Sequence, residues 1–294
     1  MFHLHDLWVY EIARGIVTYL QSPLEMWHPV DQGFMFISGL VLKVWDNPLA
    51  LILANLLSAF LALGWLALRH RSRALFVFYL GFLLSPYGIQ SLWRIHPEGY
   101  ILLLNVACFE LLETRPYLVA CLSALATWIY PTGFFMFFGL SMIAWTESLD
   151  WRVWTFPLLA GALNGIVIWG YPWKEFHRYQ WRMLHILNVK YEAVLFAHPF
   201  APWRWVFRGA TLLIGGSDIV LNQGEYWSFF LTIFNASLLT LFLLKKKHGN
   251  AWLFAAGNAV GYCLLDCLLD SSHQGIVLFW LAFAILESPG SSKE

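Results

Sequence analysis

The stretch PLALILANLLSAFLALGWLAL, residues 48–68, contains no charged side chain. A helix of about 20 apolar residues is long enough to cross the hydrocarbon core of a bilayer. The rest of the chain has the same character, since 59% of its 294 residues are hydrophobic and 12% are charged. Soluble domains carry about 25% charged residues. The sequence therefore predicts an integral membrane protein whose spans are helices.

Further apolar segments predict an all-α, polytopic membrane protein with about nine spans and additional amphipathic helices at the interface. The other long candidates run near 74–92, 152–172, 226–244 and 251–269, and the shorter ones near 98–113, 116–130, 131–146 and 274–287. Pro131 separates two of the shorter segments, because proline cannot donate a backbone hydrogen bond and disfavours helix in the preceding residue.

Basic residues in the short loops predict the orientation of the spans. The basic turns lie at 69–73, 113–116, 150–152 and 245–250, and the positive-inside rule assigns them to the cytoplasmic side. Alternate threading then places on the opposite side the N-terminus, 94–99, 130–133, 173–225 and 270–275. The chain is predicted to form one membrane domain, 1–294, with an external amphipathic segment (1–47), an external loop with interfacial helices (173–225) and a cytoplasmic tail (288–294).

This threading gathers most of the unusual polar side chains at the non-cytoplasmic face. They are Asp6, His28, Asp31, His96, Glu98, Asp270 and His273, with Asp266 one turn further inside. An ionisable group near a membrane core is costly, so the set indicates a functional site. The alternative is that each is an ordinary loop residue at a wet interface. The net charge of zero gives no basic surface for nucleic acid.

The N-terminal sequence resembles a known family of membrane enzymes. HDLWVYEIARGIVTYLQSP (5–23), followed by HPVDQGFMFISGLVLKVW (28–45), is similar to the first external loop of the GT-C glycosyltransferases. The likeness is to the branch of protein O-mannosyltransferases and aminoarabinose–lipid A transferases. His5–Asp6 stands where that family has an acidic pair, and Glu98 in RIHPEG stands where a later acidic residue opens a span. Here the chain is short, His5 replaces an acid, and the usual first span is missing.

The resemblance implies a glycosyltransferase with a lipid-phosphate-linked sugar donor and an active site on the non-cytoplasmic face. Such a reaction needs a base for the acceptor hydroxyl, and Asp6 is the candidate. Partial burial would raise the pKa of its carboxyl group toward the range useful for a base. Glu98 and His5 are the other catalytic candidates.

The leaving phosphate needs cations, which the loop 173–225 supplies. Arg178 and Arg182 are four residues apart and share a face of a helix, where two guanidinium groups can grip a phosphate, with Lys174 nearby. The alternative is an interfacial helix that binds lipid headgroups. The remaining substrate-binding candidates are Glu11, His28, His96, Asp270 and His273. Asp266, Asp270 and His273 also have the spacing of ligands for a divalent metal, but we expect contacts to substrate hydroxyls there and no metal.

Two other functions remain open. One is a noncatalytic GT-C-like subunit of a membrane complex, and the other is a transporter of lipid or small molecules. A transporter predicts charged groups along the middle of the membrane, and the spans 48–68 and 226–244 have none. The expected partners are membrane lipid, a polyprenyl-phosphate sugar and a partner membrane subunit, without nucleic acid. The expected location is a bacterial inner membrane or the endoplasmic reticulum, with the catalytic face periplasmic or lumenal.

Overall fold

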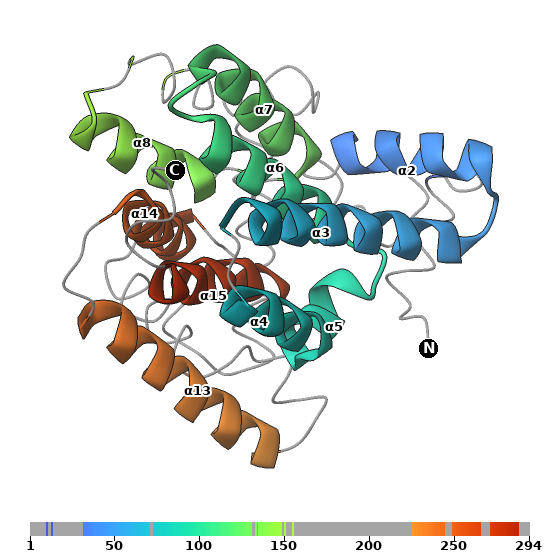
Figure 1. The fold of residues 1–294 in the computed structure, drawn as a ribbon. Coiled ribbons are helices and arrows are strands. Elements are labelled where there is room, and N and C mark those ends of the chain that lie inside the picture. The colour runs from blue at the N-terminus through green and yellow to red at the C-terminus, as the bar shows by residue number, and fades with distance from the viewer. Residues whose placement is uncertain are drawn as a thin grey trace, which may run out of the picture.

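The chain is helical throughout its described part, as the sequence predicts. The computed structural model describes residues 32–70, 73–130, 133, 135–148, 150, 225–244, 249–265 and 271–287, together with Tyr10, Ala13 and Thr155. Within these residues 87% are helical and no strand occurs. The helices, drawn in Figure 1, are α2 (Gln32–Val44), α3 (Pro48–His70), α4 (Arg73–Leu84), α5 (Pro86–Leu92), α6 (Glu98–Leu111), α7 (Pro116–Ile129), α8 (Phe135–Thr146), α13 (Glu225–Leu244), α14 (Asn250–Leu265) and α15 (Ser271–Leu286).

The number of membrane spans is not established by these helices. Among the described residues, α3 alone is long and apolar enough to cross a bilayer by itself, and six other apolar helices or helix segments have 10–17 residues. The predicted span 152–172 lies outside the described residues apart from Thr155. The coarse prediction of an all-helical chain is therefore confirmed, while the count of nine spans stays a prediction.

The predicted continuous segment 74–92 is wrong, because the structure breaks it into α4 and α5. Pro86 has no N–H to donate to the carbonyl of Phe82, four residues earlier. The Ser85 hydroxyl donates to that carbonyl oxygen instead, at 2.7 Å, and also accepts from the Gly88 N–H at 3.1 Å. Ser85 is thus the N-cap of α5, and the serine–proline pair ends one helix and begins the next.

Helices α3 and α6 run parallel, side by side. Asn55, in the second turn of α3, bonds to Gly99 at the start of α6. His70, at the end of α3, bonds to Glu110 near the end of α6, with 2.9 Å between Nε2 and Oε1. Two parallel helices need a return connection of comparable length, and α4 with α5 provides it.

One end of the bundle, where α3 ends, holds the described residues of all four basic turns. His70 lies between Glu110 and, at 3.8 Å from Nδ1, Glu287 at the end of α15. Asn250, at the start of α14, donates to Glu113 at 2.9 Å. At the same end, the Tyr117 hydroxyl donates to the Asp150 carboxylate at 3.5 Å.

The opposite end of the bundle holds the described residues of two turns that alternate threading assigns to the other side, 94–99 and 130–133. There His96, before α6, packs edge-on against Tyr130, after α7, with 5.6 Å between ring centroids. Among the described residues, these two turns therefore lie at the end opposite the basic turns, which agrees with the threading. Which end faces the cytoplasm stays a prediction.

Helix α15 forms the middle of the core (Figure 1). Its Trp280 ring is fully buried and lies 5.5 Å from the ring of Phe109 and 4.6 Å from that of Phe254, which places α6, α14 and α15 around one aromatic cluster. Aromatic pairs in this edge-to-face range contribute about 0.5–1.5 kcal/mol beyond the area that they bury.

Helices α8 and α14 approach each other through glycine. A Cβ added to Gly257 would lie 2.3 Å from the backbone nitrogen of Gly139, so no side chain separates the two backbones. Gly257 and Gly261 form a small-xxx-small motif in the sequence GNAVG. Such motifs allow close helix packing where the hydrophobic effect gives no help between helices.

One face of α3 is apolar and exposed along the length of the helix. The side chains on this face are 36–79% exposed; they are Leu49, Leu53, Leu57, Phe60, Leu61, Trp65 and Leu68. The helix has 23 residues, which at 1.5 Å per residue makes it about 34 Å long. Monomeric soluble proteins rarely expose so continuous an apolar surface.

Candidate site at the turn before helix α6

Two of the predicted site residues have described side chains, His96 and Glu98. The side chains of the others lie outside the described residues: His5, Asp6, Glu11, His28, Lys174, Arg178, Arg182, Asp270 and His273, of which His273 has a described backbone position in α15. The structure therefore shows the local geometry of the pair. Whether the pair shares a cleft with Asp6 and the arginines stays a prediction.

His96 and Glu98 flank Pro97, the residue directly before α6. Pro97 occupies the N-cap position with φ −79°, and its carbonyl accepts from the Ile101 N–H at 3.0 Å. Glu98 falls in the first turn, where the helix dipole favours a negative charge. The turn places His96 Nδ1 3.7 Å from Glu98 Oε1. The two residues do not share a helical face, because His96 precedes the helix, but they meet across the turn.

The pair is enclosed by its neighbours. The Glu98 side chain is 0% exposed, and His96 is buried beside the Tyr130 ring. A buried carboxylate costs several kcal/mol unless it is paired or hydrogen-bonded. The contact with His96 offsets part of that cost when the imidazole carries a proton. The arrangement can hold a proton between imidazole and carboxylate, or orient either group toward a third one.

Asn55 fastens this turn to α3, and sequence reasoning missed it. Its Nδ2 donates to the carbonyl oxygens of Leu92 and Arg94, at 3.0 and 3.4 Å, and its Oδ1 accepts from the Gly99 N–H at 2.7 Å. Asn55 is fully buried. One side chain thus bonds to the backbone on both sides of His96 and Glu98. The sequence indicates it only as the single amide side chain in the predicted span 48–68.

Replacing Asn55 with leucine is expected to lower the free energy of unfolding by about 2 kcal/mol or more. The substitution leaves the Gly99 N–H and the Leu92 carbonyl buried without their partner, and each orphaned group costs about 1–3 kcal/mol. Denaturant titration of the purified protein in detergent measures the change. Ser58→Ala on the same helix is the control, because the Ser58 hydroxyl bonds only to the carbonyl of Ala54 in its own helix. Equal stability of Asn55→Leu and the parent would show that the Asn55 hydrogen bonds do not stabilise the protein.

The described residues offer no metal centre at this site. In the part of the chain that the structure describes, no three His, Cys, Asp or Glu side chains are placed to hold a metal ion. Asp266 and Asp270, which the sequence pairs with His273 as alternative metal ligands, lie outside that part.

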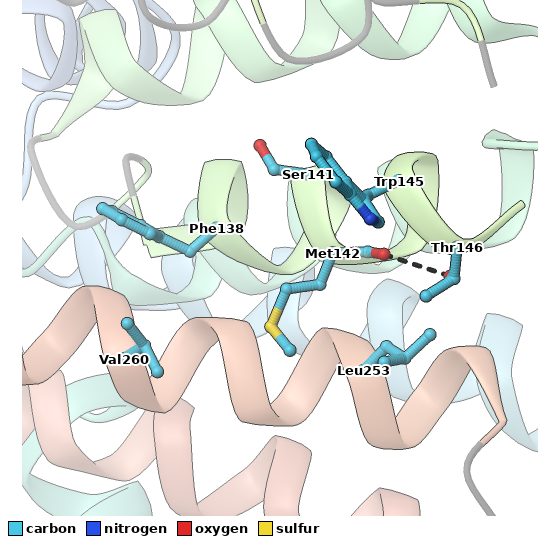
Figure 2. Close-up of a pocket in the computed structure, with 7 residues that line it drawn as sticks. All are labelled: Phe138, Ser141, Met142, Trp145, Thr146, Leu253 and Val260. Atoms are coloured by element: carbon cyan, nitrogen blue, oxygen red, sulfur yellow. Dashed lines mark hydrogen bonds between the residues drawn. The ribbon is translucent and has the colours of Figure 1, made fainter. Parts of the chain in front are cut away.

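A separate groove of about 350 Å³ lies on the surface between α8 and α14 (Figure 2). It is lined by Phe138, Ser141, Met142, Trp145, Thr146, Leu253 and Val260. The Thr146 hydroxyl donates to the Met142 carbonyl at 3.1 Å, the dashed line in Figure 2, so it is turned toward its own helix. No ionisable side chain lines this groove. It suits an apolar chain and supplies no acid, base or nucleophile of the kind that the predicted reaction needs.

Comparisons of the chain with protein-family models, with curated proteins and with solved structures gave no match. The resemblance to GT-C glycosyltransferases therefore rests on the quoted motifs alone.

Proposed function

We propose that the chain is a polytopic integral membrane protein. The exposed apolar face of α3 carries this proposal, because a helix of that length matches the thickness of a bilayer core. Helix α4 adds a second exposed apolar face through Phe76, Val77, Leu80 and Leu84. Helices α3 and α6 carry charged residues only in their first or last turns, and α7 carries none. That distribution keeps charge near the two membrane surfaces, where it costs least.

We further propose that the protein is a membrane glycosyltransferase that takes a sugar from a lipid phosphate on the non-cytoplasmic face. The supporting observation is the fixed, buried pair of His96 and Glu98 at the end of the bundle opposite the basic turns. Retaining a carboxylate at full burial is costly, and buried ionisable residues at membrane depth commonly mark functional sites. The resemblance of the N-terminal motifs gives the reaction type.

In the proposed reaction the acceptor hydroxyl oxygen forms a bond to the anomeric carbon of the donor. The bond from that carbon to the phosphate oxygen breaks, and its electron pair leaves with the phosphate. Asp6 takes the hydroxyl proton, while Arg178 and Arg182 hold the leaving phosphate. His96 and Glu98 orient the reacting groups from the start of α6. A single displacement of this kind inverts the anomeric configuration.

The Glu98→Gln variant is expected to transfer sugar about 100-fold more slowly than the parent, since misplacing the reacting groups by about 1 Å can cost about 10²-fold. The amide keeps the shape of the side chain and removes its charge. The assay reconstitutes the full chain in liposomes with a polyprenyl-phosphate sugar and follows its transfer to an acceptor hydroxyl. Glu147→Gln is the control, because Glu147 is an exposed carboxylate after α8. Parent-like transfer by Glu98→Gln would remove Glu98 from the reaction.

A second candidate function is a noncatalytic subunit of a membrane complex. The complete burial of Glu98 favours it, because a fully buried carboxylate has no direct access to a substrate. This alternative predicts that the parent itself shows no transfer with any polyprenyl-phosphate sugar. It also predicts that the chain copurifies with a second membrane protein in stoichiometric amount.

A further inference from the structure

The Asn55 side chain is connected to the backbone next to each member of the pair of His96 and Glu98. Its Nδ2 donates to the Arg94 carbonyl oxygen at 3.4 Å, and the His96 N–H donates to the same oxygen at 3.0 Å. Its Oδ1 accepts at 2.7 Å from the N–H of Gly99, the residue after Glu98. One amide on α3 therefore joins the two halves of the turn that carries the pair.

The surroundings of Asn55 leave its amide in one place. The side chain is fully buried, and its Nδ2 also donates to the Leu92 carbonyl oxygen at 3.0 Å. A Cβ on Gly99 would lie 2.1 Å from the Asn55 carbonyl oxygen and 2.5 Å from its Oδ1, so α6 begins directly against α3. The amide thus gives the turn a fixed reference point on α3.

The direct contact between His96 and Glu98 is too long to fix their separation. The 3.7 Å between Nδ1 and Oε1 exceeds the usual length of a hydrogen bond, about 2.7–3.2 Å. The separation therefore depends on where the backbone places the two residues. That backbone is bonded to Asn55 on the His96 side at Arg94 and on the Glu98 side at Gly99.

We propose that Asn55 is a positioning residue that sets the separation of His96 and Glu98 through the backbone of their turn. The role needs a donor and an acceptor at the end of one short side chain, which asparagine supplies. The inference rests on the proposed glycosyl transfer for its catalytic meaning, since the pair there orients the reacting groups. The geometry itself is testable without the reaction.

Nitrogen NMR of the full chain in lipid nanodiscs, with histidine alone isotope-labelled, tests the geometry. The ring nitrogens respond to the protonation and hydrogen bonding of the imidazole, and comparison with His96→Gln identifies the His96 signals. Asn55→Leu is expected to shift these signals. Asn235→Leu is the matched control, because Asn235 is also fully buried and donates to the Tyr87 hydroxyl at 2.7 Å, outside the turn. Unchanged His96 signals in Asn55→Leu, or equal shifts in both variants, would overturn the proposal.

Asn55→Ser provides the same test if Asn55→Leu does not fold. A serine hydroxyl in a helix can donate to the carbonyl four residues earlier, as Ser58 does to Ala54 at 2.9 Å, so the new group is satisfied. It ends one bond short of the Asn55 amide nitrogen and does not reach the Leu92 and Arg94 carbonyls. The His96 signals of Asn55→Ser are therefore also expected to shift, and parent-like signals would contradict the proposal.

The transfer assay gives a kinetic readout of the same role. Asn55→Ser is expected to lower kcat about 10²-fold, since misplacing reacting groups by about 1 Å can cost that much. The KM for the polyprenyl-phosphate sugar should stay close to that of the parent. A raised KM with unchanged kcat would show that Asn55 acts on donor binding and not on the pair. A parent that transfers no sugar would remove the proposed glycosyl transfer, and the NMR comparison would still decide the role of Asn55.

Discussion

Gly99→Leu is expected to yield no folded protein. A Cβ at this position would lie 2.1 Å from the backbone carbonyl oxygen of Asn55 and 2.5 Å from its Oδ1. The first of these atoms belongs to the backbone of α3, so no change of rotamer relieves the clash, and α3 must move away from α6. That movement breaks the Asn55–Gly99 hydrogen bond and uncovers Glu98. Size-exclusion chromatography of the detergent-extracted protein, followed by thermal unfolding, measures the loss.

Two comparison variants distinguish this clash from a general cost of replacing a helical glycine with leucine. Gly99→Ala carries the same Cβ, so it meets the same clash with the α3 backbone and is also expected to lose most of its stability. Gly64→Leu on α3 is the matched control, because a Cβ there would meet nothing within 4 Å. If Gly99→Leu eluted and unfolded like Gly64→Leu, the described contact between α3 and α6 would be wrong.

Gly257→Leu is expected to be nearly as damaging, because it separates α8 from α14. A Cβ on Gly257 would lie 2.3 and 2.4 Å from the backbone nitrogen and Cα of Gly139, and one on Gly261 would approach Phe135 and Phe138. Helices held by close backbone contact lose most of their dispersion attraction when they are pushed apart. Thermal unfolding should show a Tm lower by many degrees, or no cooperative transition.

The control for Gly257 is a glycine with open surroundings on another apolar helix. Gly81→Leu on α4 meets nothing within 4 Å at its Cβ and should unfold close to the parent temperature. If Gly257→Leu unfolded at the same temperature as Gly81→Leu, the close packing of α8 against α14 would be wrong.

Hydropathy predicts the described helices well, because a run of apolar residues between turns is a local property of the sequence. The segment 48–68 is observed as Pro48–His70, and 116–130 as Pro116–Ile129. The break at Ser85–Pro86 was missed, since the apolar run continues through it and only the hydrogen bonds of Ser85 reveal the cap. The sequence GALNG, 161–165, has the same spacing of glycines but lies outside the described residues, and the contact that the structure describes uses GNAVG.

The candidate site could be predicted only in part. Sequence spacing brings His96 and Glu98 to one turn, because Pro97 directly precedes the helix that begins at Glu98. It does not reveal Asn55, whose partners are 37 to 44 residues away in the chain. Periodicity indicates which face of a helix is buried and not which segment covers it.

The central claim is that this bundle crosses a bilayer with the turn before α6 on the non-cytoplasmic side. Single cysteines test it in a background in which Cys108, Cys121, Cys263 and Cys267 are replaced by serine. Trp93 and Thr114 are both exposed, at opposite ends of the bundle. A membrane-impermeant maleimide added to intact bacterial cells that express the protein is predicted to label Trp93→Cys at once. Thr114→Cys should be labelled only after the inner membrane is permeabilised. Labelling of both cysteines from the same side, or recovery of the chain in the soluble fraction, would contradict the claim.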